Sequence, residues 1–268
     1  MTQASNEPRT FGASDGIDWL RSGCRVFMTA PGLWLVMAIV LFFVFIALAL
    51  IPFIGTLIAQ VIGPALMGGA LLAARDSGAG RAPDLGRLFE PLVDERNRGN
   101  ILILGLLQLG GYIFALVLGL VISLLLIGGT AIQTGTLWQP GDVSASAAAA
   151  MGAGVILALL IWVALGAVVA AVFFYAVPLV ALGNAMPIDA IVNGVRGLLR
   201  NWRPLLVLGL IWTVLAILAT LPLMLGWLVL GPVTWGAWYA SYTDIFEPPP
   251  ADTADAAASE GLAQIDAD

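Results

Sequence analysis

Few side chains in this chain of 268 residues have the type and position needed for catalysis or ion transport. The sequence holds no His and a single Cys, so it offers no transition-metal ligand cluster and no His-based nucleophile pair. Its long apolar tracts contain no Asp, Glu, Arg or Lys, whereas membrane proteins that move ions usually hold ionisable groups at that depth. We therefore expect no catalytic residue, no metal ligand and no bound cofactor.

The apolar tracts do contain a few uncharged polar side chains, namely Gln60, Gln108, Ser123, Thr213 and Thr220. A polar group at that depth hydrogen bonds to a neighbouring helix or meets a ligand, because lipid offers no partner. Two of them, Gln60 and Gln108, can also face a cavity. A ligand held there would be uncharged, since no fixed charge in the spans could bind an ion.

Long apolar helices must position these side chains. The sequence is 60% hydrophobic and only 10% charged, which is too little polar surface for a soluble globular protein. A hydrocarbon core of about 30 Å needs about 20 helical residues, and turns rich in Pro, Gly and polar residues divide the apolar tracts accordingly. The sequence predicts an all-α integral membrane protein with six transmembrane helices, at about residues 32–51, 54–74, 100–128, 151–177, 204–221 and 226–243.

The arginines predict the orientation of these spans. The chain has no Lys, and its 11 Arg lie before span one, between spans two and three, or between spans four and five. Six crossings put all of them on one face, so the positive-inside rule predicts that both termini are cytoplasmic. In the alternative topology, spans two and six are re-entrant and four crossings remain. Cys24 lies beside the cytoplasmic face, as a reduced thiol or a palmitoylation site.

One element occurs twice in the sequence. VIGPALMGGALLAARD (61–76) matches VLGPVTWGAWYASYTD (229–244) in Gly, Pro, Gly and Asp at identical spacing. Each copy is expected to form a proline-kinked helix whose glycines allow close helix packing. The kinked helix either serves packing alone or lines a substrate cavity. The residues expected at the kinks and packing contacts are Gly63, Pro64, Gly68, Gly231, Pro232 and Gly236.

A second matching block precedes each kinked hairpin, with IDWLRSGCR at residues 17–25 and IDAIVNGVR at residues 188–196. Both segments are amphipathic, and we expect them to lie in the membrane interface. The expected apolar faces are Ile17, Leu20, Cys24 and Phe27 in the first, and Ile188, Ile191, Val195, Leu198 and Trp202 in the second. Both copies enter from the cytoplasm, which makes the repeat parallel, so the hairpins would pack about a pseudo-twofold axis with spans three and four completing the bundle.

Four charged residues also occupy equivalent positions in the two copies: Arg25, Asp76, Arg196 and Asp244. They form either two symmetry-related ion pairs or a solvated rim at the interface. The predicted domains are a cytoplasmic N-terminal segment with an amphipathic interfacial helix (1–31), a six-helix transmembrane domain (32–246) and a disordered acidic cytoplasmic tail (247–268).

Short motifs at residues 31–35 (PGLWL), 51–55 (IPFIG) and 239–246 (YASYTDIF) stand out. Together with the Gly-Pro and Gly of span two, they resemble an uncharacterised family of proteobacterial multi-pass inner-membrane proteins. The resemblance covers roughly residues 17–246, and the acidic tail lies outside it. It implies a Gram-negative inner membrane and no catalytic activity. A weaker similarity of layout links the chain to the membrane domain attached to some glycerophosphodiester phosphodiesterases, whose catalytic domain is missing here.

We therefore expect a non-enzymatic scaffold or assembly component of the inner membrane. Its expected partners are the lipid bilayer and either other membrane proteins or a second copy of the chain. Nucleic acid is not expected, because the net charge of −6 arises from the acidic tail alone. The alternative function is a carrier or channel for an uncharged or lipidic solute.

Overall fold

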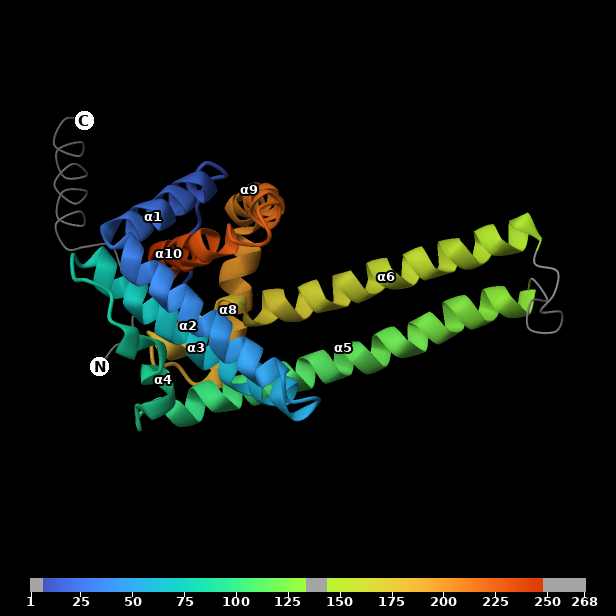
Figure 1. Cartoon of the computed structure of the whole chain (residues 1–268), viewed down its shortest axis with the longest axis horizontal. Coiled ribbons are helices and arrows are strands. Elements are labelled where there is room, and N and C mark those ends of the chain that lie inside the picture. The colour runs from blue at the N-terminus through green and yellow to red at the C-terminus, as the bar shows by residue number, and fades with distance from the viewer. Residues whose placement is uncertain (1–6, 134–143, 248–268) are drawn as a thin grey trace, which may run out of the picture.

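The computed structural model describes residues 7–133 and 144–247 (Figure 1). All regular structure in these ranges is helical, as the sequence predicts. The acidic tail from residue 248 lies outside the described residues. The helices are α1 (Asp15–Thr29), α2 (Pro31–Ala49), α3 (Ile54–Gly78), the 3₁₀ helix η1 (Leu85–Leu88), α4 (Glu90–Val93), α5 (Arg98–Gln133), α6 (Ala145–Phe174), α7 (Ala176–Ala181), α8 (Pro187–Arg200), α9 (Trp202–Thr220) and α10 (Trp227–Phe246).

Five helical segments are long and apolar enough to cross a membrane: α2, α3, α5, α6 together with α7, and α9. They coincide with the first five predicted spans. The sixth prediction falls on α10, which is not among them. The interior of α10 carries Thr234, Ser241 and Asp244, which lower its hydropathy. A membrane protein with several spans is therefore established, whereas the count of six is not.

The α5–α6 hairpin is longer than predicted. Its helices have 36 and 30 residues, or about 54 and 45 Å at 1.5 Å per residue. They lie side by side, and their outer half extends away from the other helices (Figure 1). In the same view α9 is seen nearly end-on, so it crosses the direction of the hairpin. Both helices continue past the predicted limits, because no Pro or charge interrupts either of them there.

The turns that join α2 to α3 and α9 to α10 have the same construction. A Cβ on Gly55 would overlap the Leu48 carbonyl oxygen, and a Cβ on Gly226 would lie 2.5 Å from Ala219 Cα. Two residues before each glycine the backbone has a positive φ, 61° at Phe53 and 65° at Met224. Such values are rare outside glycine. Both glycines are therefore required for the close return of the chain.

The first amphipathic segment, α1, packs against the protein through a face other than the apolar face that we expect to lie in the membrane interface. Trp19, Gly23 and Val26 are buried, whereas Ile17 is 37% exposed and Cys24 is exposed. A Cβ on Gly23 would overlap the Val233 carbonyl oxygen of α10. Small residues let two backbones approach, and hydropathy alone does not reveal such a face.

The second amphipathic segment, α8, also packs against the protein through small residues. Its buried face contains Ala190, Gly194 and Gly197, while Ile188 and Trp202 from the predicted stripe are more than half exposed. Gly194 meets the α6–α7 junction at Tyr175 rather than α10. The two amphipathic helices therefore use equivalent glycines against different neighbours.

Hydrogen bonds join the two ends of the described chain. The Arg9 amide donates to the Ile245 carbonyl at 3.0 Å, and the Arg9 guanidinium donates to the Glu247 carbonyl at 2.7 Å. The buried Asn201 side chain donates to the Arg9 carbonyl and accepts from the Phe11 amide, both at 2.8 Å. The N-terminal segment, the start of α9 and the end of α10 are thereby held at one place.

Candidate functional site

The proline of α3 lies inside the helix, as the sequence predicts. Pro64 has no backbone N–H, so the carbonyl of Gln60 lacks its usual helical donor. One turn later, a Cβ on Gly68 would lie 2.6 Å from the Ala181 Cβ of α7. Gly68 is therefore a packing contact, whereas Gly63 meets nothing within 4 Å. Gly63, just before Pro64, therefore faces open space, and Gly68, one turn after it, faces α7.

The open side of Gly63 faces a pocket of about 280 Å³, which we call the kink pocket. Helices from both halves of the chain and the α5–α6 hairpin enclose it. Most of its lining side chains are only partly buried, so it opens to the outside of the protein. Its lining comprises Phe45, Ala59, Gln60, Gly63, Pro64, Met67, Gln108, Tyr112, Ala170, Phe173, Phe174, Val177 and Trp238.

Three uncharged polar side chains in the kink pocket lack partners. No hydrogen bond joins Gln60, Gln108 or Tyr112 through its side chain to another described residue. The Gln108 side-chain oxygen and Trp238 Nε1 are fully buried and also unpaired among these residues. Burying such groups without partners costs several kcal/mol in an apolar medium. The pocket therefore has unused hydrogen-bonding capacity.

The other three polar side chains that the sequence singles out in the apolar tracts are hydrogen bonded within the protein. Ser123, Thr213 and Thr220 each donate to the carbonyl four residues earlier, at 2.7–2.8 Å. Ser123 also accepts from Trp162 Nε1 at 3.1 Å, and Thr220 accepts from Trp227 Nε1 at the same distance. Of the two roles left open by the sequence, bonding to a neighbouring helix applies to Ser123 and Thr220, and Thr213 bonds within its own helix. Gln60 and Gln108 line a pocket.

No charged side chain lines the kink pocket. The nearest acid on α3 is Asp76, about 18 Å from Pro64 along the helix axis at 1.5 Å per residue. On α5 the first charge is Arg98, about 15 Å from Gln108 by the same measure. The pocket is therefore apolar with a few neutral hydrogen-bonding groups, a composition typical of sites for uncharged ligands.

The second proline of the repeat, Pro232, lies inside α10 at a place that α1 covers. A Cβ on Gly236 would lie 2.8 Å from Gly23 Cα and 3.0 Å from Val26 Cβ. Gly231, the counterpart of Gly63, lies outside the kink pocket and meets only the Trp235 ring, at 3.9 Å. One kink is therefore covered by helix packing, and the other contributes to a pocket.

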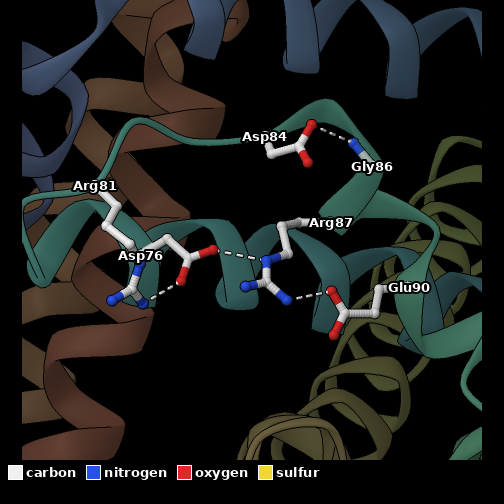
Figure 2. Close-up of polar contacts among 6 residues, drawn as sticks. All are labelled: Asp76, Arg81, Asp84, Gly86, Arg87 and Glu90. Atoms are coloured by element: carbon white, nitrogen blue, oxygen red, sulfur yellow. Dashed lines mark hydrogen bonds and ion pairs between the residues drawn. The ribbon is translucent and has the colours of Figure 1, made fainter.

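The charged residues at the helix ends are paired differently from either expectation. Asp76 is only 4% exposed, and its carboxylate accepts from Arg81 at 2.5 Å and from Arg87 at 2.6 Å (Figure 2). Arg87 also donates to Glu90 at 2.5 Å. A solvated position for Asp76 is therefore wrong, because the loop after α3 folds back over it.

Two features of the loop hold these arginines in place. Asp84 caps η1 by accepting from the Gly86 amide at 3.0 Å (Figure 2), and Leu88 is fully buried. The hydrogen bonds from Arg87 to Glu90 and Asp76 raise the pKa of the Arg87 guanidinium above its ordinary value. Arg87 is therefore a permanent cation beneath the end of α3.

The three other predicted interfacial charges do not form the symmetry-related pairs. Asp244 accepts from Trp19 Nε1 at 2.7 Å. Arg25 is exposed and donates to Ser22 Oγ at 2.8 Å, and Arg196 is exposed. The two aspartates occupy equivalent sequence positions, yet one pairs with the loop after its own helix and the other with α1.

Residues 95–264 match a family described as a domain of unknown function, DUF7847. The chain belongs to this family. The match covers α5 to α10 and extends into the acidic tail. The resemblance in short motifs, by contrast, ends at about residue 246. DUF7847 carries no assigned activity in its description. It gives no sign of an enzyme.

A relative of this DUF7847 protein is a "probable inner membrane protein" of Burkholderia thailandensis. The two are 30% identical over 207 residues, which is 76% of this chain and 74% of the relative. No solved structure matches the chain. The chain is thus a multi-pass member of an uncharacterised family of proteobacterial membrane proteins.

Several residues of the kink pocket cannot be selected from the sequence alone. Tyr112, Phe174 and Trp238 come from α5, α6 and α10, and each is an ordinary aromatic residue in an apolar helix. Only their convergence around Gln60 and Gln108 distinguishes them. A glutamine one turn before a Gly-Pro step was the available signal, because it puts a polar side chain beside a helix kink.

Proposed function

We propose that this DUF7847 protein binds an uncharged, lipidic solute in the kink pocket and acts as a carrier for it within the inner membrane. The observation that carries the proposal is the convergence of Gln60 and Gln108 in an uncharged pocket beside Pro64, where neither side chain has a hydrogen-bond partner among the described residues. A bound ligand would satisfy these groups, whose exposure to hydrocarbon is unfavourable.

The proposed topology has six crossings, with both termini in the cytoplasm. Support comes from the hydrogen bonds that link Arg9 with Asn201 and with Ile245. Residues so linked lie on one face of the membrane. If α9 crosses from that face, α10 must return to it, so α10 is the sixth crossing despite its lower hydropathy. The arginine distribution supports a cytoplasmic location for this face.

Single cysteines introduced at Ala145 and Ala79 in a Cys24→Ser background test this topology. Both positions are exposed, at the start of α6 and just after α3. An impermeant maleimide added to intact cells is expected to label residue 145 and not residue 79, while disrupted membranes allow both reactions. Labelling of both residues in intact cells, or of residue 79 alone, would contradict the proposed orientation.

We also propose that α1–α3 and α8–α10 are two copies of one parallel repeat. Support comes from the matched turns, in which Gly55 and Gly226 pack against residues 48 and 219 with the same spacing. The copies differ at their kinks because α7 lies between α3 and α8, whereas α1 packs directly on α10. The kink pocket therefore lies beside Pro64 of the first copy, whereas α1 covers the corresponding part of the second copy.

Leucine in place of Gly63 is expected to remove the ligand without unfolding the protein. The new side chain would fill pocket space and meet no backbone, since nothing lies within 4 Å of a Cβ there. Overcrowding of about 1–3 kcal/mol corresponds to a loss of affinity of about 5- to 150-fold. The amount of lipid that co-purifies with the protein, quantified by mass spectrometry after extraction, is the measurement.

Gly231→Leu is the matched control, because Gly231 is the repeat counterpart of Gly63 and lies outside the kink pocket. It should retain the wild-type amount of bound solute. Equal retention by both leucine variants would contradict the carrier proposal. A decrease confined to Gly63→Leu, with an unchanged melting temperature, would support it.

A scaffold or assembly role is the second candidate. The outer half of the α5–α6 hairpin favours it, because this part extends beyond the other helices with large apolar side chains such as Leu124 and Leu125 about 70% exposed (Figure 1). A protein partner that cross-links at these positions and is lost on Leu124→Ala and Leu125→Ala substitution would favour this role. The same variants should not change the bound solute if the kink pocket is the functional site.

A further inference from the structure

We infer that the ligand of the kink pocket is a neutral lipid whose head group is a flat ring bearing carbonyl oxygens, the chemistry of a membrane quinone. This inference rests on the proposed function and names its substrate class. Three properties of the pocket lead to it: its aromatic walls, its hydrogen-bond donors and its size.

Aromatic side chains line the pocket from four different helices. Phe45 comes from α2, Tyr112 from α5, Phe174 from α6 and Trp238 from α10. Phe174 and Trp238 are already stacked, with ring centroids 5.0 Å apart and an interplanar angle of 24°. Aromatic faces favour offset stacking or edge contacts with another flat ring. A planar head group gains such contacts, whereas an alkyl chain alone does not.

The neutral polar groups of the pocket include several donors. Gln60 and Gln108 each carry an amide NH₂, and Tyr112 carries a hydroxyl. None of these side chains has a hydrogen-bond partner among the described residues. Trp238 Nε1 is a further donor, fully buried and unpaired among these residues. Carbonyl oxygens only accept hydrogen bonds, so a ring with carbonyl groups would satisfy these donors, whereas the buried Gln108 side-chain oxygen would accept from the hydroxyl group of the reduced form of such a ring. No charged side chain is present to bind a phosphate or carboxylate head group.

The pocket volume suits a substituted ring with its tail outside. A cavity of about 150 Å³ accommodates benzene, and the kink pocket measures about 280 Å³. This space holds one ring with substituents and excludes a whole isoprenoid lipid. Because the pocket opens to the surface between partly buried side chains, a long apolar tail would extend into the surrounding membrane.

The test uses the full-length protein in nanodiscs and a benzoquinone with a decyl tail. Binding is followed by quenching of tryptophan fluorescence, with decanol as a competitor that has the same tail and a hydroxyl group in place of the ring. We expect saturable quinone binding, little competition by decanol, and loss of binding in Gly63→Leu. Tyr112→Phe removes one donor and keeps the aromatic ring, so it should weaken binding about 3- to 10-fold.

Tyr239→Phe is the matched control for the hydroxyl, because Tyr239 lies on α10 outside the kink pocket. It should bind the quinone as the wild type does. Full competition by decanol, or unchanged binding in Tyr112→Phe, would overturn the quinone inference and leave the proposed carrier function standing. Failure of the wild type to bind either compound, together with no co-purifying lipid, would overturn both.

Discussion

Leucine in place of Gly236 is expected to lower the free energy of unfolding by about 1–3 kcal/mol, and leucine at Gly68 by a similar amount. At Gly236 the new side chain would meet the backbone of α1, since a Cβ already lies 2.8 Å from Gly23 Cα. At Gly68 it would meet Ala181, 2.6 Å away on α7. Neither neighbour is the end of a flexible side chain, so helices must move apart.

Thermal melting of the purified variants in detergent measures this effect. Gly110→Leu is the matched control on another apolar helix, because nothing lies within 4 Å of Gly110 and the residue is exposed. Phe43→Leu, at a position 62% exposed, reports on an ordinary membrane-facing substitution. Both controls should melt close to the wild type. If only one of the glycine variants melts early, the two copies of the repeat do not rely on equivalent packing.

The helices themselves could be predicted from the sequence, because hydropathy and helix length are linked by the bilayer thickness. The end of α2 and the start of α3 follow from Pro52 and Gly55, because the backbone conformations that these two residues allow or exclude are set locally. The ends of α5 and α6 could not be obtained in this way, since both helices continue past the thickness of one bilayer with no residue that stops them.

Packing faces were harder to predict than helices. For α1, hydropathy selects Ile17 and Cys24, yet the contact with α10 depends on Gly23. A glycine contributes little to any hydropathy pattern. Its structural role is to let the backbone of a neighbouring helix approach closely. Which backbone approaches a given glycine is known only from the tertiary structure. Gly23 of α1 lies against α10, whereas its counterpart Gly194 of α8 lies against the α6–α7 junction at Tyr175.

The residues of the kink pocket also fall into those that the sequence could predict and those that it could not. The polar type of Gln60 and Gln108 was sufficient to mark them as candidates, because a neutral amide in an apolar helix needs a partner. Tyr112 and Trp238 could not be selected, since their roles depend on the convergence of α5 and α10 beside the kink of α3. Residue type therefore identifies candidate hydrogen-bonding side chains, and the tertiary structure shows which of them meet in one pocket.

Asparagine in place of Asp76 is expected to lower the free energy of unfolding by about 1.5–3 kcal/mol, the range for hydrogen bonds that involve a charged group. A fully buried ion pair would cost more to break, but the side chains of Arg81 and Arg87 are 61% and 31% exposed and can be hydrated in part. The loop after α3 should loosen as well, because its two arginines lose a common partner (Figure 2).

Asp244→Asn is the matched control for Asp76→Asn. Its side-chain oxygen can still accept from Trp19 Nε1, so we expect a loss below about 1 kcal/mol. A double-mutant cycle with Asp76→Asn and Arg87→Gln, followed by thermal melting, separates the pair from its surroundings. Coupling of at least about 0.5 kcal/mol is expected for residues in direct contact. If Asp76→Asn melts like the wild type and the cycle shows no coupling, then Asp76 is solvated and the loop does not cover it.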